Sequence, residues 1–209
     1  MPEGDVVVDV VLKEVEGVDL GGSVLWAPYN VGASKPTEYG DYFAWGETSP
    51  KTIYNWDSYQ YCDGVVGNYP QLTKYNTSSK YGTVDNKTVI ETSDDAAAQK
   101  WNGTWRMPTL DEMKELLTGC TCTWVSNYKD TNVSGYEITT SDNSIFLPAA
   151  GRYINSSVES GAEYVYYWAN SIHSGDDRSN DMFGYSDGLY TSSIYRYYGY
   201  TIRPVKSKS

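Results

Sequence analysis

The stretch WRMPTLDEMKELLTG, residues 105–119, decides the fold class because it contains the clearest helix signal in the chain. Thr109 and Glu112 have the spacing of a capping box, which predicts a helix from Thr109 to Thr118. Four apolar side chains would share one face of this helix: Leu110, Met113, Leu116 and Leu117. Gly119 follows as the expected stop. The stretch therefore predicts an amphipathic helix that packs one face on a core.

A shorter helix is expected at residues 94–101, where two aspartates open a run of strong helix formers that ends at Asn102-Gly103. On both sides of the helices the chain alternates between β-rich segments and turns. The predicted strands are 6–12, 18–20, 23–27, 39–45, 122–125, 136–140, 144–147, 164–169 and 200–205. Residues 46–90 have no clear period and predict a long irregular region. Strands, two short helices and strands again indicate the α+β class.

The net charge of −11 argues against partners that require clustered positive charge. Lysines are scattered singly except at Lys206 and Lys208, so nucleic acid is not an expected partner. No stretch reaches the roughly 18–20 apolar residues of a membrane span, so direct membrane insertion is not expected. The first residues have neither the basic nor the apolar region of a signal peptide.

The aromatic composition is unusual, with 21 Tyr and 7 Trp but only 3 Phe. Tyr and Trp combine an apolar body with a polar group, so they serve half-exposed surfaces as well as cores. Asn, Ser, Thr and Gly are also abundant. This composition predicts an irregular β protein that is rich in loops.

Residues that carry chemistry are sparse. Cys62, Cys120 and Cys122 are expected to be inert free thiols, although a bridge from Cys62 to either of the others stays open. His173 is the single histidine, and no Cys/His cluster has the spacing of a zinc site. No phosphate loop, nucleophile elbow or HExxH motif is present, and no carboxylate spacing identifies a glycosidase pair. We therefore expect no catalytic residue, no metal ligand and no cofactor.

Several short segments follow one another in a characteristic order: VDLG (18–21), WA (26–27), NVGA (30–33), EYGDYFAWGE (38–47), DDAA (94–97), WRMPT (105–109), FLPAAG (146–151), YW (167–168) and RYYGYTIRPV (196–205). Together they resemble the Fibrobacter succinogenes major paralogous domain, which is common in surface proteins of gut Bacteroidales. That family is similar to the formylglycine-generating-enzyme branch of the C-type-lectin-like fold. The resemblance implies this fold for a ligand-binding domain at residues 18–206, with 1–17 as an N-terminal strand or linker extension. It also implies an extracytoplasmic location, at the bacterial cell surface or secreted.

Some members of that family are variable proteins of diversity-generating retroelements, in which adenines are replaced in a C-terminal stretch. The stretch lies before a closing Gly-x-x-[Ile/Val]-Arg-Pro-Val strand, which Gly199 to Val205 matches, so the resemblance implies a variable segment at about 164–198. Adenine replacement in Asn codons cannot produce Lys, Glu, Gln, Trp or Met. Residues 169–198 contain none of the first four types, which make up 32 of the 209 residues, and Met182 is the one exception. The composition therefore supports active or past diversification.

The same segment has the mixture of residues that antibody loops use, with Tyr as rigid contact area and Ser, Gly and Asn as adaptable hydrogen-bonding groups. We predict that it forms a recognition face in which several tyrosines are anchors. The expected ligand-binding residues are Asn170, Ile172, His173, Asp176, Asp177, Arg178, Asp181, Tyr185, Asp187, Tyr190, Ile194, Tyr195 and Tyr197. In this interpretation His173 is a variable contact and not a metal ligand.

Other distinctive residues are assigned to the scaffold. Residues 166–168 lie in the best strand of the segment and are expected to belong to the core, and 198–200 are also expected to be scaffold. Trp105 is expected to enter the core, and Arg106 to pair with a carboxylate or with strand carbonyls. Arg203 is expected to be a fixture of the terminal strand.

The leading hypothesis is a surface-displayed receptor or adhesin domain whose C-terminal face binds a protein or another cell-surface ligand. The alternative is a carbohydrate-binding module, which predicts a concave aromatic groove. An enzyme of the formylglycine-generating type is disfavoured, since it needs cysteines near the C-terminal end and Cys122 is the last one. The calcium motifs of sugar-binding C-type lectins are absent. A structural calcium ion in loops such as Asp176-Asp177 or Asp85-Asn86 stays open, although no motif supports it.

Overall fold

The computed structural model describes residues 15–101 and 104–208, so the predicted strand at 6–12 and the expected helix end at Asn102-Gly103 lie outside the described residues. The strands are β1 Val18–Asp19, β2 Val24–Trp26, β3 Cys62–Val66, β4 Tyr69–Leu72, β5 Thr121–Val125, β6 Gly135–Thr139, β7 Ser144–Pro148, β8 Arg152–Ile154, β9 Ser157–Glu159, β10 Val165–Ile172, β11 Arg178–Tyr185, β12 Gly188–Tyr195 and β13 Val205–Ser207. The helices are α1 Ala96–Trp101 and α2 Leu110–Gly119, with 3-10 turns at Trp56–Ser58, Ser79–Tyr81, Thr92–Asp94 and Tyr128–Asp130. Strands on both sides of short helices confirm the predicted α+β class.

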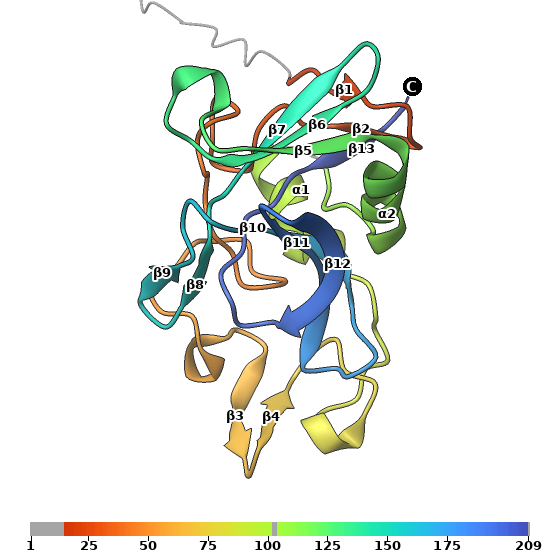
Figure 1. The fold of residues 1–209 in the computed structure, drawn as a ribbon. Helices are drawn as coiled ribbons and strands as arrows, with labels where there is room; N and C mark the ends of the chain where they lie inside the picture. Colours follow the sequence, from red (N-terminus) through yellow and green to blue (C-terminus); the bar gives the residue numbers. More distant parts are fainter. Residues whose placement is uncertain (1–14, 102–103, 209) are drawn as a thin grey trace, which may run out of the picture.

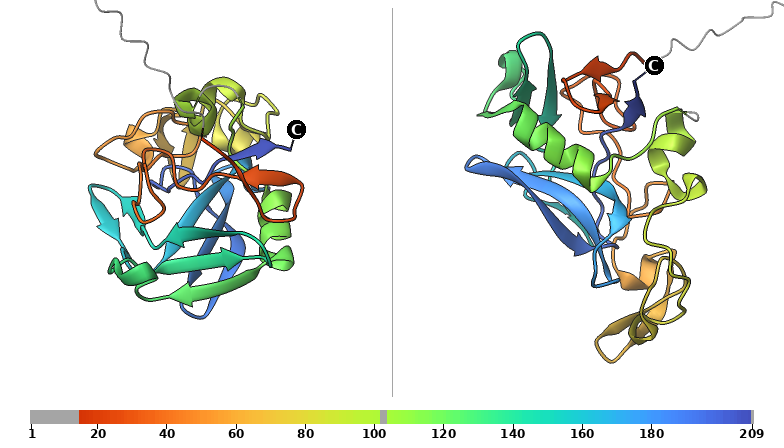
Figure 2. Two further views of the ribbon diagram at one scale, coloured as in Figure 1. Left: turned by 90° about the horizontal axis from the view of Figure 1, so that it is seen from above. Right: turned by 90° about the vertical axis from the view of Figure 1, so that its right-hand side faces the viewer.

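The strands form small antiparallel sheets (Figure 1). β10, β11 and β12 make a central sheet, and β5, β6 and β7 make a second one. A third sheet pairs β2 with both β1 and β13, which brings the two ends of the described chain together. The hairpins β3–β4 and β8–β9 extend from this body. α2 lies across one face of the central sheet, which leaves the other face for the site described below (Figure 2).

The predicted capping box forms the start of α2. The Glu112 amide donates to Thr109 Oγ1 at 3.1 Å, and the Thr109 amide donates to Glu112 Oε2 at 2.8 Å. Arg106 donates to both carboxylate oxygens of Glu112, at 2.6 and 2.9 Å, which confirms the expected pairing of this arginine. The predicted apolar face packs on the core through Leu110, Met113, Leu116 and Leu117. Capping and amphipathicity together thus determine α2.

α1 begins later than predicted because Asp95 caps it. Its Oδ1 accepts hydrogen bonds from the amides of Ala97 and Ala98, at 2.9 and 3.2 Å, while Oδ2 accepts one from the Met107 amide at 2.8 Å. The residues before Asp95 form a 3-10 turn instead of a helical turn. In the described part of the chain, no helix is long and apolar enough to cross a bilayer.

The central sheet separates two hydrophobic cores because side chains alternate along β10. Tyr166 and Trp168 point into one core, which the loops of the N-terminal half complete. Val165, Tyr167 and Ala169 point into the other, which contains the apolar face of α2 and parts of β6 and β7. Tyr166 is 6% exposed and both Tyr167 and Trp168 are 0% exposed, so the core positions predicted for these residues are confirmed.

Two predicted strands, at 39–45 and 200–205, are wrong for most of their length. They meet at a single antiparallel bridge between Phe43 and Tyr200. The indole of Trp168 donates to the Phe43 carbonyl at 2.8 Å, so a side chain shares the acceptor of this bridge. The aromatic pattern reflects core packing here and not a ladder of backbone hydrogen bonds.

Arg203 ties the C-terminal segment to three other parts of the chain. It is 0% exposed and donates to Asn30 Oδ1 at 2.8 Å, to the Ala27 carbonyl at 3.1 Å and to the Phe146 carbonyl at 2.7 Å. Its expected structural role is therefore confirmed, as is the core position of Trp105, which is 2% exposed.

Candidate binding site

The face of the central sheet that is turned away from α2 is built from two rows of cross-strand neighbours. One row is Tyr166, Phe183 and Tyr190, and the other is Trp168, Asp181 and Ser192. Residues opposite one another on antiparallel strands point to the same side of the sheet. The rows therefore place aromatic rings next to a carboxyl group on one surface.

A pocket of about 180 Å³, here called the sheet pocket, opens on this face. It is lined by residues of the two rows, of β8 and of the chain from β12 onward: Arg152, Tyr166, Asp181, Phe183, Ser192, Ser193, Ile194 and Tyr200. Sites for whole small molecules have volumes of roughly 300–1,000 Å³. The sheet pocket therefore fits one ring or one terminal group of a larger ligand.

Asp181 is the most buried charged residue of the sheet pocket. It is 2% exposed, and its Oδ1 has no hydrogen-bond partner among the described residues. Burial raises the pKa of its carboxyl group to about 7, although the hydroxyl of Tyr200 and the charge of Arg152 act in the opposite direction. A buried polar atom without a partner costs free energy, and perturbed carboxyl groups in pockets are frequent at functional sites. Asp181 is therefore the strongest single indication of a ligand site.

Arg152 brings a cation to the same pocket from β8. Its guanidinium carbon lies 5.1 Å from the ring centroid of Tyr166 and 5.0 Å from that of Tyr198. Nη2 lies 3.8 Å from Oε2 of Glu159, and Nε is buried without a hydrogen-bond partner among the described residues. The two rings hold the guanidinium group in place by cation–π contacts. The N–H donors of Arg152 and the carboxyl acceptor of Asp181 therefore line the same small pocket.

Aromatic rings form the walls of the sheet pocket. The ring of Tyr200 lies 4.3 Å from that of Trp168 and 4.8 Å from that of Tyr166, measured between centroids. The rings of Tyr166 and Phe183 are 15° from parallel with centroids 6.4 Å apart, and Phe183 lies 5.8 Å from Tyr190. We call Tyr166, Phe183 and Tyr190 the aromatic strip. It runs from the buried wall of the pocket to Tyr190, which is 46% exposed.

The sheet pocket contains only part of the predicted recognition face. Asp181 and Ile194 line it, and Tyr190 ends the aromatic strip beside it. Tyr185 is half-buried, with its ring 5.2 Å from that of Tyr164, and Asp187 is exposed in the turn between β11 and β12.

The other predicted residues lie toward the opposite end of the β11–β12 hairpin. Arg178 and Tyr185 are the two ends of β11, about 23 Å apart at roughly 3.3 Å per residue. The guanidinium carbon of Arg178 lies 4.7 Å from the ring of Tyr195, which stacks on Tyr197 at 5.8 Å, and Tyr197 meets Trp56 at 4.9 Å. The predicted residues thus form two groups and not one contiguous face.

Three predicted contact residues are buried, which corrects their assignment to an exposed face. Ile172 is 9% exposed because β10 extends through it and directs it into the core. Asp176 is 3% exposed and accepts hydrogen bonds from the amide and the hydroxyl of Thr77, at 2.9 and 2.8 Å. Both are structural residues. Asp181, also buried, can contact only a group that enters the sheet pocket.

The remaining predicted residues surround the loop after β10. His173 is exposed and Asp177 is half-buried. Asn170 is partly buried, and its backbone N–H donates to the Pro108 carbonyl at 2.8 Å. The carboxylate of Asp85, in the other loop considered for calcium, also accepts a hydrogen bond within the protein. Its donor is the backbone N–H of Asn76, at 2.9 Å. Within residues 15–101 and 104–208, no cluster of three or more His, Cys, Asp or Glu side chains could hold a metal ion.

The three cysteines lie away from the sheet pocket. Cys62, Cys120 and Cys122 are free and half-buried, and burial raises the pKa of each thiol. A raised pKa keeps a thiol protonated and poorly nucleophilic at neutral pH, which is typical of unreactive cysteines.

Sequence reasoning missed several residues of the pocket: Arg152, Phe183, Ser192, Ser193 and the wall-forming rings of Tyr166 and Tyr200. A signal existed for Phe183, since residues two apart in a strand share a face and Asp181 was already a candidate. The turn before Gly188 then sets Ser192 opposite Asp181. No local signal points to Arg152, which reaches the pocket from a hairpin that the pattern did not reveal.

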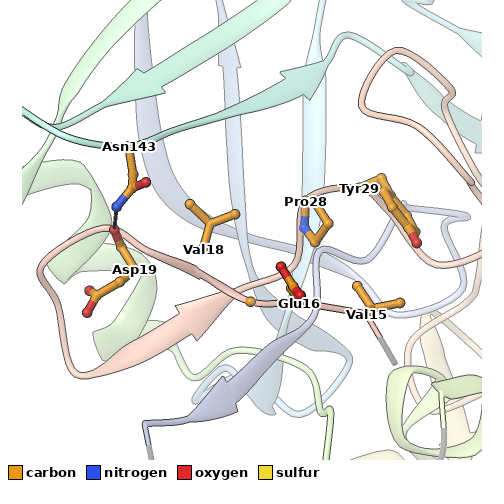
Figure 3. A pocket seen from close by; sticks show the side chains of 8 residues that line it. Val15, Glu16, Val18, Asp19, Pro28, Tyr29 and Asn143 are labelled. Atoms are coloured by element: carbon orange, nitrogen blue, oxygen red, sulfur yellow. Dashed lines mark hydrogen bonds between the residues drawn. The ribbon is translucent and has the colours of Figure 1, made fainter. Parts of the chain in front are cut away.

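Two other pockets are lined by carboxylates that already accept hydrogen bonds. A pocket of about 630 Å³ beside β1 is lined by Val15, Glu16, Gly17, Val18, Asp19, Pro28, Tyr29 and Asn143 (Figure 3). The carboxylate of Asp19 there already accepts hydrogen bonds from Lys208 at 2.7 Å and from the Gly21 amide at 2.8 Å. A pocket of about 290 Å³ beside Trp105 includes Asp95, whose carboxylate caps α1.

Comparison with known proteins finds no family model, curated protein or solved structure that matches this chain. The function must therefore be argued from the site itself.

Proposed function

We propose that the chain is a non-catalytic ligand-binding domain of the receptor or adhesin type, and that the sheet pocket with its aromatic strip is the binding site. The observation that carries this proposal is the unpartnered oxygen of Asp181 in a small pocket with aromatic walls. Concave sites with apolar walls and a few convergent polar groups are the usual form of ligand-binding sites. In this proposal the ligand supplies the hydrogen bonds that the carboxyl group lacks.

The distribution of residue types supports a recognition role for this sheet. Met182, the one residue of 169–198 that adenine replacement in Asn codons cannot produce, is 0% exposed in the core that contains α2. Tyr190, Ser192 and Ile194 on the opposite face all belong to the types that such replacement can produce. We propose that the chain is a variable protein with the C-type-lectin-like fold, displayed at a bacterial cell surface or secreted. Its outward positions would vary while the inward ones remain fixed.

This proposal can be tested by a substitution that places a charged side chain at the edge of the sheet pocket. Ser192 is exposed and lines the pocket, so Ser192→Arg should obstruct it without disturbing the core. Fluorescently labelled protein is measured by flow cytometry on a panel of intact mammalian epithelial and bacterial cells. We expect the wild type to bind at least one cell type, and Ser192→Arg to weaken that binding by more than about tenfold.

Ser141→Arg is the matched control, because Ser141 is an exposed serine in the turn between β6 and β7 and lies outside the pocket. It should bind as the wild type does. Equal binding by Ser192→Arg and the wild type would place recognition elsewhere on the molecule. Absence of binding by the wild type to every cell in the panel would count against the receptor or adhesin function.

A further inference from the structure

The polar groups of the sheet pocket specify a ligand group with its own donors and acceptors. Asp181 presents an unpartnered carboxyl oxygen, and Arg152 presents an unpartnered Nε–H. Ser192, which lies opposite Asp181, adds a hydroxyl group at the same pocket, and a hydroxyl can donate or accept. A wholly apolar group would leave these atoms unpaired, at a cost in free energy.

The charges of the pocket favour a neutral ligand group. A cation would approach the guanidinium group of Arg152. An anion would approach the carboxyl group of Asp181, which is about half ionised at pH 7, in a chain whose net charge is −11. Either charge would therefore be opposed by a like charge in the pocket or on the chain. Paired hydroxyl groups satisfy the carboxyl group and the guanidinium N–H together without adding a charge.

Two neutral groups have both donors and acceptors and fit the polar atoms of the pocket, a primary amide and a sugar ring. The aromatic strip favours the sugar ring. A primary amide is planar and small, and it would use the polar groups without covering the rings. A sugar ring has hydroxyl groups along its edge and C–H groups on its faces, so it can hydrogen-bond at its edge while a face packs on aromatic rings. Phe183 neighbours Asp181 on β11, and Tyr190, which is 46% exposed, neighbours Ser192 on β12. The aromatic strip therefore lies beside the polar groups of the pocket.

We propose that the sheet pocket binds one neutral sugar ring of a glycan, with two adjacent hydroxyl groups hydrogen-bonded to Asp181 and Arg152 and one ring face packed on Phe183 and Tyr190. This inference rests on the proposed binding function and names its ligand class. The pocket volume of about 180 Å³ limits direct recognition to a single ring, and the rest of the glycan lies outside.

The test is a titration of the ¹⁵N-labelled protein with methyl glycosides of galactose, glucose, mannose and fucose, followed by NMR. At least one glycoside should bind in the millimolar range, and the backbone amide signals of Asp181, Ser192 and Ser193 should shift while that of Arg178 does not. N-acetylglutamine amide is the probe for a primary amide, and it should cause no comparable shift. This measurement uses the wild-type chain and does not depend on the folding of any variant.

Two pairs of variants test the polar contacts. Arg152→Met removes the guanidinium donors from the pocket, whereas Arg178→Met removes an arginine that also lies over a tyrosine ring but lines no part of the pocket. Asp181→Asn changes the buried carboxyl group, and Asp142→Asn makes the same change at an exposed turn. Arg152→Met and Asp181→Asn should each weaken glycoside binding by about tenfold or more, and the two controls should not.

The outcomes separate this inference from the proposed function. If no glycoside binds but Ser192→Arg still abolishes cell binding, the sugar inference is wrong and the binding function stands. Shifts produced by N-acetylglutamine amide alone would also overturn the inference, since they would identify an amide site. If Ser192→Arg leaves cell binding intact and no glycoside binds, the sugar inference is wrong and the sheet pocket is not the binding site, although the chain still binds cells. If the wild type binds no cell, the receptor or adhesin function fails.

Discussion

Asp181 has a carboxyl pKa of about 7 because it is buried, with Arg152, Tyr200 and Tyr166 lining the same pocket. The folded-state pKa is raised above the ordinary value of 3.8, so the carboxyl group destabilises the folded protein as it ionises. Its contribution to stability is fully present below about pH 3.8 and is lost as the pH rises through about 7.

Asp181→Asn should remove this pH dependence, because an amide has nearly the same shape and does not ionise. We expect the free energy of unfolding of Asp181→Asn, relative to that of the wild type, to increase by about 2.5 kcal/mol between pH 5 and pH 8. Urea denaturation at the two pH values measures this change. Asp142→Asn should show no such increase. A constant difference between Asp181→Asn and the wild type at both pH values would mean that Asp181 is not a perturbed carboxyl group.

The burial of two aspartates could not be predicted from the sequence. Asp176 and Asp181 stand in a polar, tyrosine-rich run that is typical of an exposed surface, yet they are 3% and 2% exposed. The burial of Asp176 depends on hydrogen bonds from Thr77, which is 99 residues away in the chain. No pattern within the segment contains that information, because the donor comes from a distant loop.

At the scale of elements, α2 is determined by local interactions, so its capping can be tested by itself. Thr109→Ala removes the hydroxyl that accepts from the Glu112 amide and should lower the free energy of unfolding by about 1 kcal/mol. Thr118→Ala, at an exposed position near the other end of the same helix, should change it by less than about 0.5 kcal/mol. Urea denaturation measures both variants. An equal loss of stability in the two would contradict the capping role of Thr109.

The elements that sequence analysis located are those with a strong local pattern. α2 and the strands β5, β6 and β7 lie within one or two residues of the predicted ranges, because capping and alternation mark them locally. β11 and β12 were not predicted, although they form most of the candidate site. The sequence of β12, GLYTSSIY, is rich in Gly, Ser and Thr, and its burial is intermediate at most positions, so alternation of apolar and polar residues is weak.

At the scale of the whole molecule, the central sheet has one face in the core with α2 and another that carries the proposed binding site. One face of the sheet belongs to the core shared with α2, β6 and β7, so substitutions there disturb packing. The other face combines the buried rings of Tyr166 and Trp168 with exposed positions on β12. If the proposed function is correct, substitutions at the exposed β12 positions should alter binding while the free energy of unfolding changes little.

Sequence analysis anticipated this division only in part. The core positions 166–168 and the α+β class are confirmed by the structure, whereas the recognition segment at about 164–198 stays a prediction. Sequence analysis did not anticipate that Arg152 lies outside the segment and lines the same pocket, or that the residues near Arg178 and those near Asp181 lie apart along β11. Both depend on pairings between distant parts of the chain, which are not encoded in local patterns.

The most direct test of the central claim is a scan of all single substitutions in the displayed protein. Surface display on yeast is measured together with binding to the cell type that the wild type recognises. Display reports folding, so positions that lose binding while display is retained identify the recognition surface. We predict that these positions cluster around the sheet pocket, at Arg152, Phe183, Tyr190 and residues 192–194. A cluster elsewhere, for example around the pocket beside β1, or loss of binding only where display is also lost, would contradict the account.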